Sequence, residues 1–433
     1  MMTEHDDQGV EGEGLFDPRV MSRRNTLKMG LMGLALLGLA GSATQVVRLA
    51  SKSAPKKKVA AQVAAADIPR NIKDWPSLDA LGDNMVRRKL TPGVSLSVMH
   101  DGTLIYSKAF GVANVQSGAE MTPVTGSRVA SITKQFTAAA VLLLAEQGKV
   151  RLDDPLSRFL PDFPRAGDIT LRQMLSHTAG LSDYINGQSH DILVAAQTRD
   201  YTAEELVPII RSRTPLYRFQ PGTSWLYSNS GFALLGIVVE KVSGVAFADF
   251  CDQHLFKPAG LKNTTIDKTC TTANVCSGYT PNYRTAGGFD LNMPVSPSFI
   301  GGAGAIRSTT EDLCQWHCAL LNGKVLKPHS VLAMTTPTLL KNGTPAYEHR
   351  GPEAMEYGLG MGIGTLPEDD LKVISHGGRV NGFTGHLRSV PEAKLTVAIL
   401  YNSDGGGAPG FSAAQKSLRS EATKLGLKDV GVA

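Results

Sequence analysis

Ser131-Ile132-Thr133-Lys134 places a lysine three residues after a serine. On a helix these two positions share a face, so the lysine amine can reach the serine oxygen. The sequence predicts a helix here, because apolar residues follow at helical spacing and Gly148 stands where a C-terminal cap belongs. The apolar residues are Phe136, Ala139, Ala140, Leu143 and Leu144. A serine activated by a lysine at this spacing is the nucleophile of one class of acyl-transfer enzymes.

The same spacing occurs a second time, from Ser53 to Lys56. That pair lies in an Ala- and Lys-rich tract without an apolar face at helical spacing. One or two such pairs are expected by chance in a chain of this length, given ordinary serine and lysine usage. The helical context therefore favours Ser131 as the nucleophile.

Tyr227-Ser228-Asn229 stands just before a second predicted helix, from Gly231 to Val242, which closes at Gly244. Tyrosine has an ordinary pKa near 10, so it is a poor base unless a nearby cation or a coupled lysine shares the proton. Lys134 can supply that influence, and the Asn229 amide can orient Lys134 and bind a substrate amide. Tyr184-Ile185-Asn186 repeats the pattern but lacks a following helix start, so we favour Tyr227.

His376-Gly377-Gly378 follows a predicted strand at Val373-Ile374-Ser375. Paired glycines let a substrate backbone approach the strand edge, which a side chain at either position would obstruct. The backbone N–H of Arg379, together with that of Ser131, is expected to form an oxyanion hole. Taken alone, this motif favours a glycine turn beside a structural histidine; the presence of Ser131 and Tyr227 favours a role in the site.

The ordered set Ser131-x-x-Lys134, Tyr227-x-Asn229 and His376-Gly377-Gly378 resembles the serine β-lactamase and penicillin-recognising hydrolase superfamily. The similarity covers roughly residues 75 to 425 and is closest to class C β-lactamases, D-alanyl-D-alanine carboxypeptidases, D-aminopeptidases and related esterases. Three further stretches support it: residues 175–181 (Leu-Ser-His-Thr-Ala-Gly-Leu), residues 301–313 around Gly301-Gly302-Ala303-Gly304, and Gly382-Phe383 with Pro391-Glu392.

The resemblance implies an α/β (α+β) two-lobe fold, with an antiparallel sheet flanked by helices and the active site in the cleft beside a helical lobe. Ser131 would attack a carbonyl, Lys134 and Tyr227 would move the proton, and an acyl-enzyme would form and hydrolyse. Asn229, His376, Gly377 and Gly378 would bind substrate. No metal and no organic cofactor is implied, and His177 corresponds to a structural loop.

One departure from the family pattern bears on the substrate. Class C β-lactamases carry Lys-Thr-Gly where this chain has His376-Gly377-Gly378, and that lysine faces the substrate carboxylate. Histidine is mostly neutral at pH 7, so strong β-lactamase activity is not expected. Arg379 is a candidate source of cationic character. Ala130, where relatives often have glycine, is a smaller departure.

Three functions stay open on these residues. The first is a serine hydrolase that cleaves a peptide bond, of the D-amino acid or D-Ala-D-Ala type, or a carboxylic ester. The second is a β-lactamase, and the third is a catalytically weak penicillin-binding or sensing module. The expected partner is a small molecule or a peptidoglycan-derived peptide or ester. The sequence does not define an oligomeric state.

The N-terminus has the pattern of an export signal. Paired arginines in Ser22-Arg23-Arg24-Asn25-Thr26-Leu27-Lys28 precede an uncharged run from Met29 to Ala43, as in a twin-arginine signal. We therefore expect residues 1–43 to be the signal, residues 44–73 to be a flexible linker, and the protein to be periplasmic or secreted. An uncleaved inner-membrane anchor is the alternative, although fifteen residues are short for a span.

Composition excludes other classes of function. The chain has 433 residues and a formal net charge of +5, and the excess is spread without basic blocks interleaved with aromatics, so nucleic-acid binding is not expected. Five cysteines cannot all pair. Cys270 and Cys276 could close a small loop. Cys314, His317 and Cys318 lie on one predicted helix and lack a second ligand pair nearby, so we expect no zinc site.

Strand patterns lie at both ends of the folded region, which is expected to span residues 74–430. Residues 94–99 and 104–110 alternate in polarity around an Asp101-Gly102 turn, and further strands are predicted at 387–390 and 395–400. Helical and loop signals lie between them, including a capping box from Thr170 to Gln173. We predict an α/β lobe of residues 74–155 and 298–430, with a helical lobe of residues 156–297 inserted between its two parts.

Overall fold

The computed structural model describes residues 68–185, 190–267, 276–285, 287–293, 295–348, 355–366, 368 and 370–432, which all fall within one compact unit. The predicted export signal, most of the predicted linker and Cys270 lie outside these residues. Cys276 is a buried free thiol.

A nine-stranded antiparallel sheet is the centre of the fold, in the order β3-β2-β1-β14-β13-β12-β11-β10-β9. The strands are β1 (Gly93–His100), β2 (Thr103–Asn114), β3 (Ala119–Glu120), β9 (Tyr347–Glu348), β10 (Met355–Tyr357), β11 (Gly362–Leu366), β12 (Leu371–Val380), β13 (Phe383–Val390) and β14 (Leu395–Tyr401). Because β1 pairs with β14, the two ends of the chain meet in one sheet, as the sequence predicts. Asp101 and Gly102 both have positive φ, which matches the predicted tight hairpin turn.

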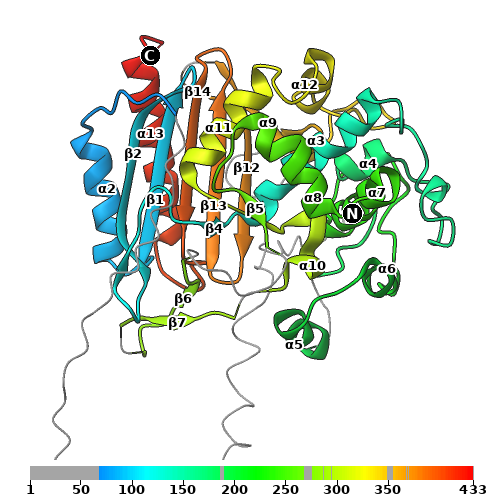
Figure 1. Ribbon diagram of the computed structural model, residues 1–433, viewed down its shortest axis with the longest axis horizontal. Coiled ribbons are helices and arrows are strands. Elements are labelled where there is room, and N and C mark those ends of the chain that lie inside the picture. Colours follow the sequence, from blue (N-terminus) through cyan, green and yellow to red (C-terminus); the bar gives the residue numbers. More distant parts are fainter. Residues whose placement is uncertain are drawn as a thin grey trace, which may run out of the picture. The chain divides into compact units, whose positions relative to one another are not determined.

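Helices cover both faces of the sheet (Figure 1). On one face, α2 (Pro76–Arg87) and α13 (Phe411–Asp429) pack on apolar residues of β1, β2 and β14. The other face packs against the larger apolar core, to which α3 (Thr133–Glu146), α7 (Asn229–Ser243) and α11 (Thr310–Leu321) contribute. Further helical segments are η2 (Ala130–Ile132), η3 (Leu156–Arg158), α4 (Leu171–Leu175), α5 (His190–Thr198), α6 (Ala203–Arg211), α8 (Phe247–Cys251), η4 (Asp252–Phe256), α9 (Lys257–Ala259), α10 (Pro297–Ile300), η5 (Gly301–Ala303) and α12 (Pro328–Met334).

Two features of the fold differ from the sequence prediction. Residues before Asp74 pack on the sheet, because the N–H groups of Asn71 and Lys73 donate to β2 carbonyls and Arg70 forms a bidentate ion pair with the buried Glu311. In addition, part of the predicted helical lobe is extended, in β5 (Thr265–Ile266), β6 (Tyr279–Pro281) and β7 (Phe289–Leu291). β5 pairs with β8 (Ile306–Ser308), and β8 in turn pairs with β4 (Ser127–Arg128) next to the nucleophile turn.

No single helix among the described residues is long and apolar enough to cross a bilayer. One bent pair, α7 with the following segment from Phe247 to Ala259, passes the same test of length and composition together. Most of α7 is buried in the protein core.

A buried polar network ties the nucleophile helix to the sheet. His317, on α11, is completely buried, with Nδ1 2.6 Å from Ser389 Oγ of β13 and Nε2 2.8 Å from Gln135 Oε1 of α3. Burial lowers the pKa of His317 to about 3, because the charged imidazolium is poorly solvated in this position. These ring contacts also occupy the nitrogens that the alternative zinc interpretation would require. Within the described residues, no group of three or more His, Cys, Asp or Glu side chains could hold a metal ion.

We expect His317 to make the protein less stable in acid. In the unfolded chain its pKa returns to about 6.5, so the unfolded state binds a proton that the folded state excludes. Stability from this group is complete above pH 6.5 and falls as the pH drops toward 3, by about 2 kcal/mol between pH 6.5 and 5. Guanidinium unfolding at pH 7 and pH 5 measures the loss. His317→Gln should be less stable at pH 7 and less sensitive to acid; an unchanged pH dependence would contradict this account.

Candidate active site

The predicted nucleophile lies at the junction of η2 and α3. Ala130, just before Ser131, has φ of +47°, a left-handed conformation that glycine adopts without strain and alanine does not. This geometry explains why glycine suits the position in the family pattern. The turn presents Ser131 with its side chain partly exposed, while Lys134 is completely buried one helical turn later.

Lys134 Nζ is surrounded by oxygen acceptors. It lies 3.1 Å from Ser131 Oγ, 2.8 Å from Asn229 Oδ1 and 2.8 Å from the carbonyl oxygen of Ala303. The ring centroids of Tyr227 and Phe232 lie 4.7 and 5.5 Å from the same nitrogen. Three acceptors match the three donors of an ammonium group, and the aromatic faces attract its charge. The arrangement aims the amine at the serine oxygen.

Tyr227 lies on the other side of the nucleophile, with Oη 2.6 Å from Ser131 Oγ. The structure therefore brings Ser131, Lys134, Tyr227 and Asn229 together, as the sequence motifs predict. The competing tyrosine, Tyr184, is completely buried and donates instead to the carbonyl oxygen of Phe299. Asn186 of that repeated pattern lies outside the described residues.

His177 holds the backbone on both sides of Tyr227. Its carbonyl oxygen accepts from Leu226 N at 3.0 Å, and its Nδ1 accepts from Ser228 N at 3.1 Å. Its ring centroid lies 4.4 Å from that of Tyr227. His177 itself has φ of +60°, so the loop that carries it must be held firmly. His177 therefore has a structural role, which is to hold the backbone around Tyr227.

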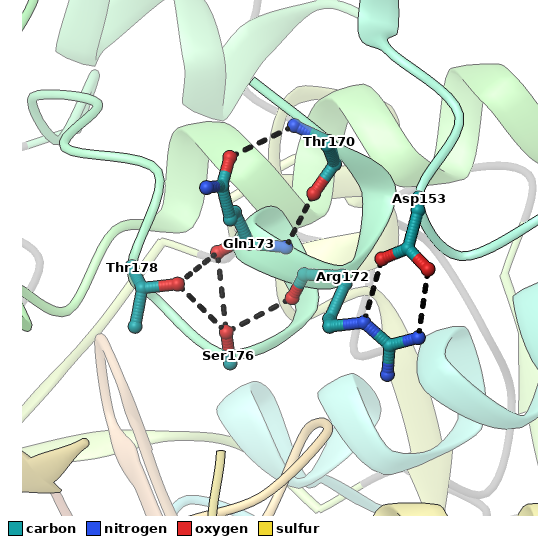
Figure 2. A network of polar contacts seen from close by, with 6 residues as sticks. All are labelled: Asp153, Thr170, Arg172, Gln173, Ser176 and Thr178. Carbon is teal, nitrogen blue, oxygen red and sulfur yellow. Dashed lines mark hydrogen bonds and ion pairs between the residues drawn. The ribbon is translucent and has the colours of Figure 1, made fainter. Parts of the chain in front are cut away.

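The loop that carries His177 is fixed by hydrogen bonds around α4, as Figure 2 shows. The predicted capping box is present, with reciprocal bonds between Thr170 and Gln173. The Gln173 carbonyl oxygen accepts from Thr178 N at 2.8 Å, and Ser176 Oγ lies 3.0 Å from Thr178 Oγ1. An ion pair between Arg172 and Asp153 joins α4 to the preceding loop. This network holds the His177 ring against that of Tyr227.

The third motif lies on β12, beside the nucleophile turn. Asn381 and Gly382 form a two-residue turn into β13, so Val380 and Phe383 exchange hydrogen bonds. Hydrogen-bonding directions alternate along a strand, so the N–H of Arg379 points away from β13 and toward the β11 side of β12. Pairing with β11 ends at Ser375, so it does not reach Arg379. A Cβ at Gly378 would lie 2.1 Å from Val129 O and 3.2 Å from Ser131 N. Gly378 therefore allows β12 to approach the nucleophile turn.

The alternation along β12 corrects two details of the sequence interpretation. Positions 377 and 379 face one side of the sheet, and positions 376 and 378 face the other. A Cβ at Gly377 would meet no atom closer than 3.9 Å. The close-approach argument for glycine thus holds for Gly378 alone, and the neighbour is the nucleophile turn rather than substrate. The Arg379 side chain also leaves on the far face, so it does not replace the missing lysine.

His376 is buried and neutral. Its Nδ1 lies 2.5 Å from the Gly377 carbonyl oxygen, so Nδ1 carries the proton, and Nε2 accepts from the Tyr357 hydroxyl at 2.9 Å. Burial, together with the charge of Lys134, lowers the pKa of His376 to about 3. The position that holds a lysine cation in class C β-lactamases therefore carries no charge at neutral pH.

Sequence reasoning missed two side chains of the site. Tyr357, on β10, binds His376 and packs its ring 4.9 Å from that of His177. Asp183, in the loop after α4, accepts from both the backbone N–H and the side-chain Nδ2 of Asn229, each at 2.8 Å. Neither residue stands at a fixed spacing from a motif residue within one element, so no local sequence pattern points to it.

Comparisons with known proteins give the family of this chain. Residues 78–419 match the family described as Beta-lactamase. Penicillin-binding protein 4* of Bacillus subtilis is 28% identical over 322 residues, covering 70% of this chain and 66% of that protein. A D-aminopeptidase of Cereibacter sphaeroides is 28% identical over 334 residues, covering 76% of this chain and 60% of that protein. The chain thus matches less than two thirds of the length of these curated relatives.

Solved structures show the same fold. A D-stereospecific amidohydrolase from Streptomyces sp. superposes with a TM-score of 0.65 and is 26% identical, covering 78% of this chain and 97% of that one. The family match and the shared fold therefore agree with each other. The chain belongs to the Beta-lactamase family of serine hydrolases.

Proposed function

We propose that this protein is an exported serine hydrolase that forms an acyl-enzyme on Ser131 and cleaves a peptide or amide bond next to a D-amino acid. The observation that carries the chemistry is the position of Ser131 Oγ, within hydrogen-bond reach of both Lys134 Nζ and Tyr227 Oη. Export, to the periplasm or outside the cell, is supported by the twin-arginine pattern at residues 22–28.

The geometry supports a sequence of proton transfers. Ser131 Oγ attacks the carbonyl carbon, and its proton passes to Lys134 or Tyr227, which both lie within hydrogen-bond reach of it. The oxyanion that forms is bound by the N–H groups of Ser131 and Arg379. Tyr227 protonates the leaving amine as the bond breaks and leaves an ester on Ser131. Water then attacks the ester and gives a proton to the same pair, which returns a proton to Ser131 Oγ as the acyl–oxygen bond breaks.

The neutral His376 supports an amide substrate without a carboxylate at this position. A buried, uncharged imidazole cannot offer the ion pair that a β-lactam or a C-terminal carboxylate would need. The printed names of the D-aminopeptidase relative and the D-stereospecific amidohydrolase neighbour support the choice of a D-amino acid substrate.

The proposal is tested on the form that comprises residues 44–433, with Ser131→Ala as control. The substrates are amides of D- and L-phenylalanine, a D-Ala-D-Ala peptide, a p-nitrophenyl ester and benzylpenicillin, and intact mass reports acylation. We expect turnover of the D-amide and little turnover of the L-amide. Ester turnover alone would assign an esterase, rapid loss of benzylpenicillin a β-lactamase, and a lasting penicillin adduct without turnover a penicillin-binding module. Each of these three results would overturn the amidase proposal.

Replacing His376 by lysine tests the charge argument. A cation at this position can form a charge-assisted hydrogen bond with the benzylpenicillin carboxylate, worth about 1.5–3 kcal/mol, so acylation should become roughly 10–100 times faster. His376→Gln, which is neutral, should give no gain. The rate of adduct formation by mass spectrometry measures the effect. If His376→Lys folds normally and reacts no faster, the missing cation is not what limits β-lactams.

A further inference from the structure

Asp183 joins two parts of the active site that lie far apart in the sequence. One carboxylate oxygen, Oδ2, accepts from the backbone N–H and from Nδ2 of Asn229, and Oδ1 accepts from Ile185 N, all at 2.8 Å. Asn229 is the first residue of α7, whose N-cap residue Ser228 makes no side-chain cap bond. Asp183 therefore places a negative charge at the N-terminus of α7, where it is favoured by the helix dipole and binds an N–H group that the helix leaves open.

The same contact decides which way the Asn229 amide faces. An asparagine amide has a donor end and an acceptor end, and the two can exchange by rotation of the group. Because Asp183 can only accept while ionised, it binds the Nδ2 end, and Oδ1 is then turned toward Lys134 Nζ at 2.8 Å. With the reverse orientation, Nδ2 would face the amine of Lys134, donor against donor.

We propose that Asp183 is a positioning residue for acylation, which acts through the Asn229 amide to hold Lys134 against Ser131. The inference rests on the proposed function, because it concerns the acylation step of that reaction. The chain of contacts runs from the Asp183 carboxylate to Asn229 Nδ2, from Asn229 Oδ1 to Lys134 Nζ, and from Lys134 Nζ to Ser131 Oγ.

The primary test measures acylation in Asp183→Ala and Asp183→Asn. Loss of the carboxylate frees the Asn229 amide, and misplacement of a reacting group by about 1 Å costs on the order of 100-fold in rate. We expect kcat of Asp183→Ala to fall about 100-fold with little change in KM. Asp183→Asn keeps one acceptor oxygen for both N–H groups of Asn229, but its Nδ2 then faces the Ile185 N–H, so it should recover only part of the rate. Equal acylation rates for wild type and Asp183→Ala would overturn the proposal, as would Asp183→Asn slower than Asp183→Ala.

A double-mutant cycle separates positioning from stability. If Asp183 acts through Asn229, then Asp183→Ala should slow acylation in the wild-type background and have no further effect in the Asn229→Ala background. The lost contact with the N-terminus of α7 should lower the thermal midpoint in both backgrounds, and this effect is measured separately from the acylation rate. Independent, multiplicative effects on the acylation rate would rule out action through Asn229.

Asp312→Ala is the matched control. Asp312 likewise binds a loop through its carboxylate, accepting from Asn263 N at 2.7 Å and Thr264 Oγ1 at 2.8 Å, and these carboxylate bonds, within the part of the chain that the structure describes, do not involve Ser131, Lys134, Tyr227 or Asn229. It should lower stability and leave the acylation rate per folded molecule unchanged. A fall in that rate comparable with Asp183→Ala would show that general loosening explains both variants.

An activated phosphonate ester that labels nucleophilic serines serves as the acylation probe, so the outcome does not depend on the natural substrate. Failure of the wild type to label at Ser131 would remove the proposed function and the inference together. Labelling of wild type and Asp183→Ala at the same rate would remove the inference alone. Slow labelling of Asp183→Ala, with Asp183→Asn intermediate between it and the wild type, would support both.

Discussion

Ser131→Ala is expected to abolish turnover of every amide and ester that the wild type hydrolyses. Removal of the nucleophile in a serine hydrolase lowers kcat on the order of 10⁶-fold, because no other group can form the acyl-enzyme. The fold should persist, since Lys134 keeps Asn229 Oδ1 and the Ala303 carbonyl as acceptors. Steady-state rates with the best amide, together with intact mass after exposure to the phosphonate probe, measure the effect.

Ser417→Ala is the control for this variant. Ser417 lies on the exposed side of α13, on the face of the sheet opposite the nucleophile, and donates within its own helix to the Ala413 carbonyl oxygen. It should match the wild type in rate and in labelling. A fall in kcat much smaller than about 10⁶-fold in Ser131→Ala would mean that another residue is the nucleophile.

Tyr227→Phe is expected to slow acylation by roughly 10²–10⁴-fold, the contribution typical of a positioned acid–base group. The substitution removes the hydroxyl that lies 2.6 Å from Ser131 Oγ, while the ring contact with His177 is kept. Little loss of stability is expected. Pre-steady-state acylation, compared with thermal unfolding monitored by circular dichroism, separates the two effects.

Tyr184→Phe provides the matched comparison, because it removes the hydroxyl of the other Tyr-x-Asn pattern. That hydroxyl is buried and bound to the Phe299 carbonyl oxygen, so its loss leaves a buried acceptor without its partner, at a cost of about 1–3 kcal/mol in stability. The acylation rate per folded molecule should not change. Unchanged kinetics in Tyr227→Phe would remove Tyr227 from the mechanism.

The sequence by itself determined what depends on local chain geometry. Ser131 and Lys134 share a helix face because of the helical repeat alone, and the capping box at Thr170 satisfies the open N–H groups of its own first turn. The Asp101-Gly102 turn likewise follows from residues that accept positive φ. The order of the motifs indicated the family, and the family resemblance implied the α/β architecture.

Contacts between distant segments were decided only by the tertiary structure. Asn229 reaches Lys134 across 95 positions and Asp183 across 46, so neither pairing leaves a periodic signal in the sequence. The neutral state of His376 depends on its burial beside Lys134 and Tyr357, which are brought together by packing of the sheet against α3. Local patterns fix backbone conformation over a few residues, whereas hydrogen-bond partners and desolvation depend on which surfaces meet when the chain folds.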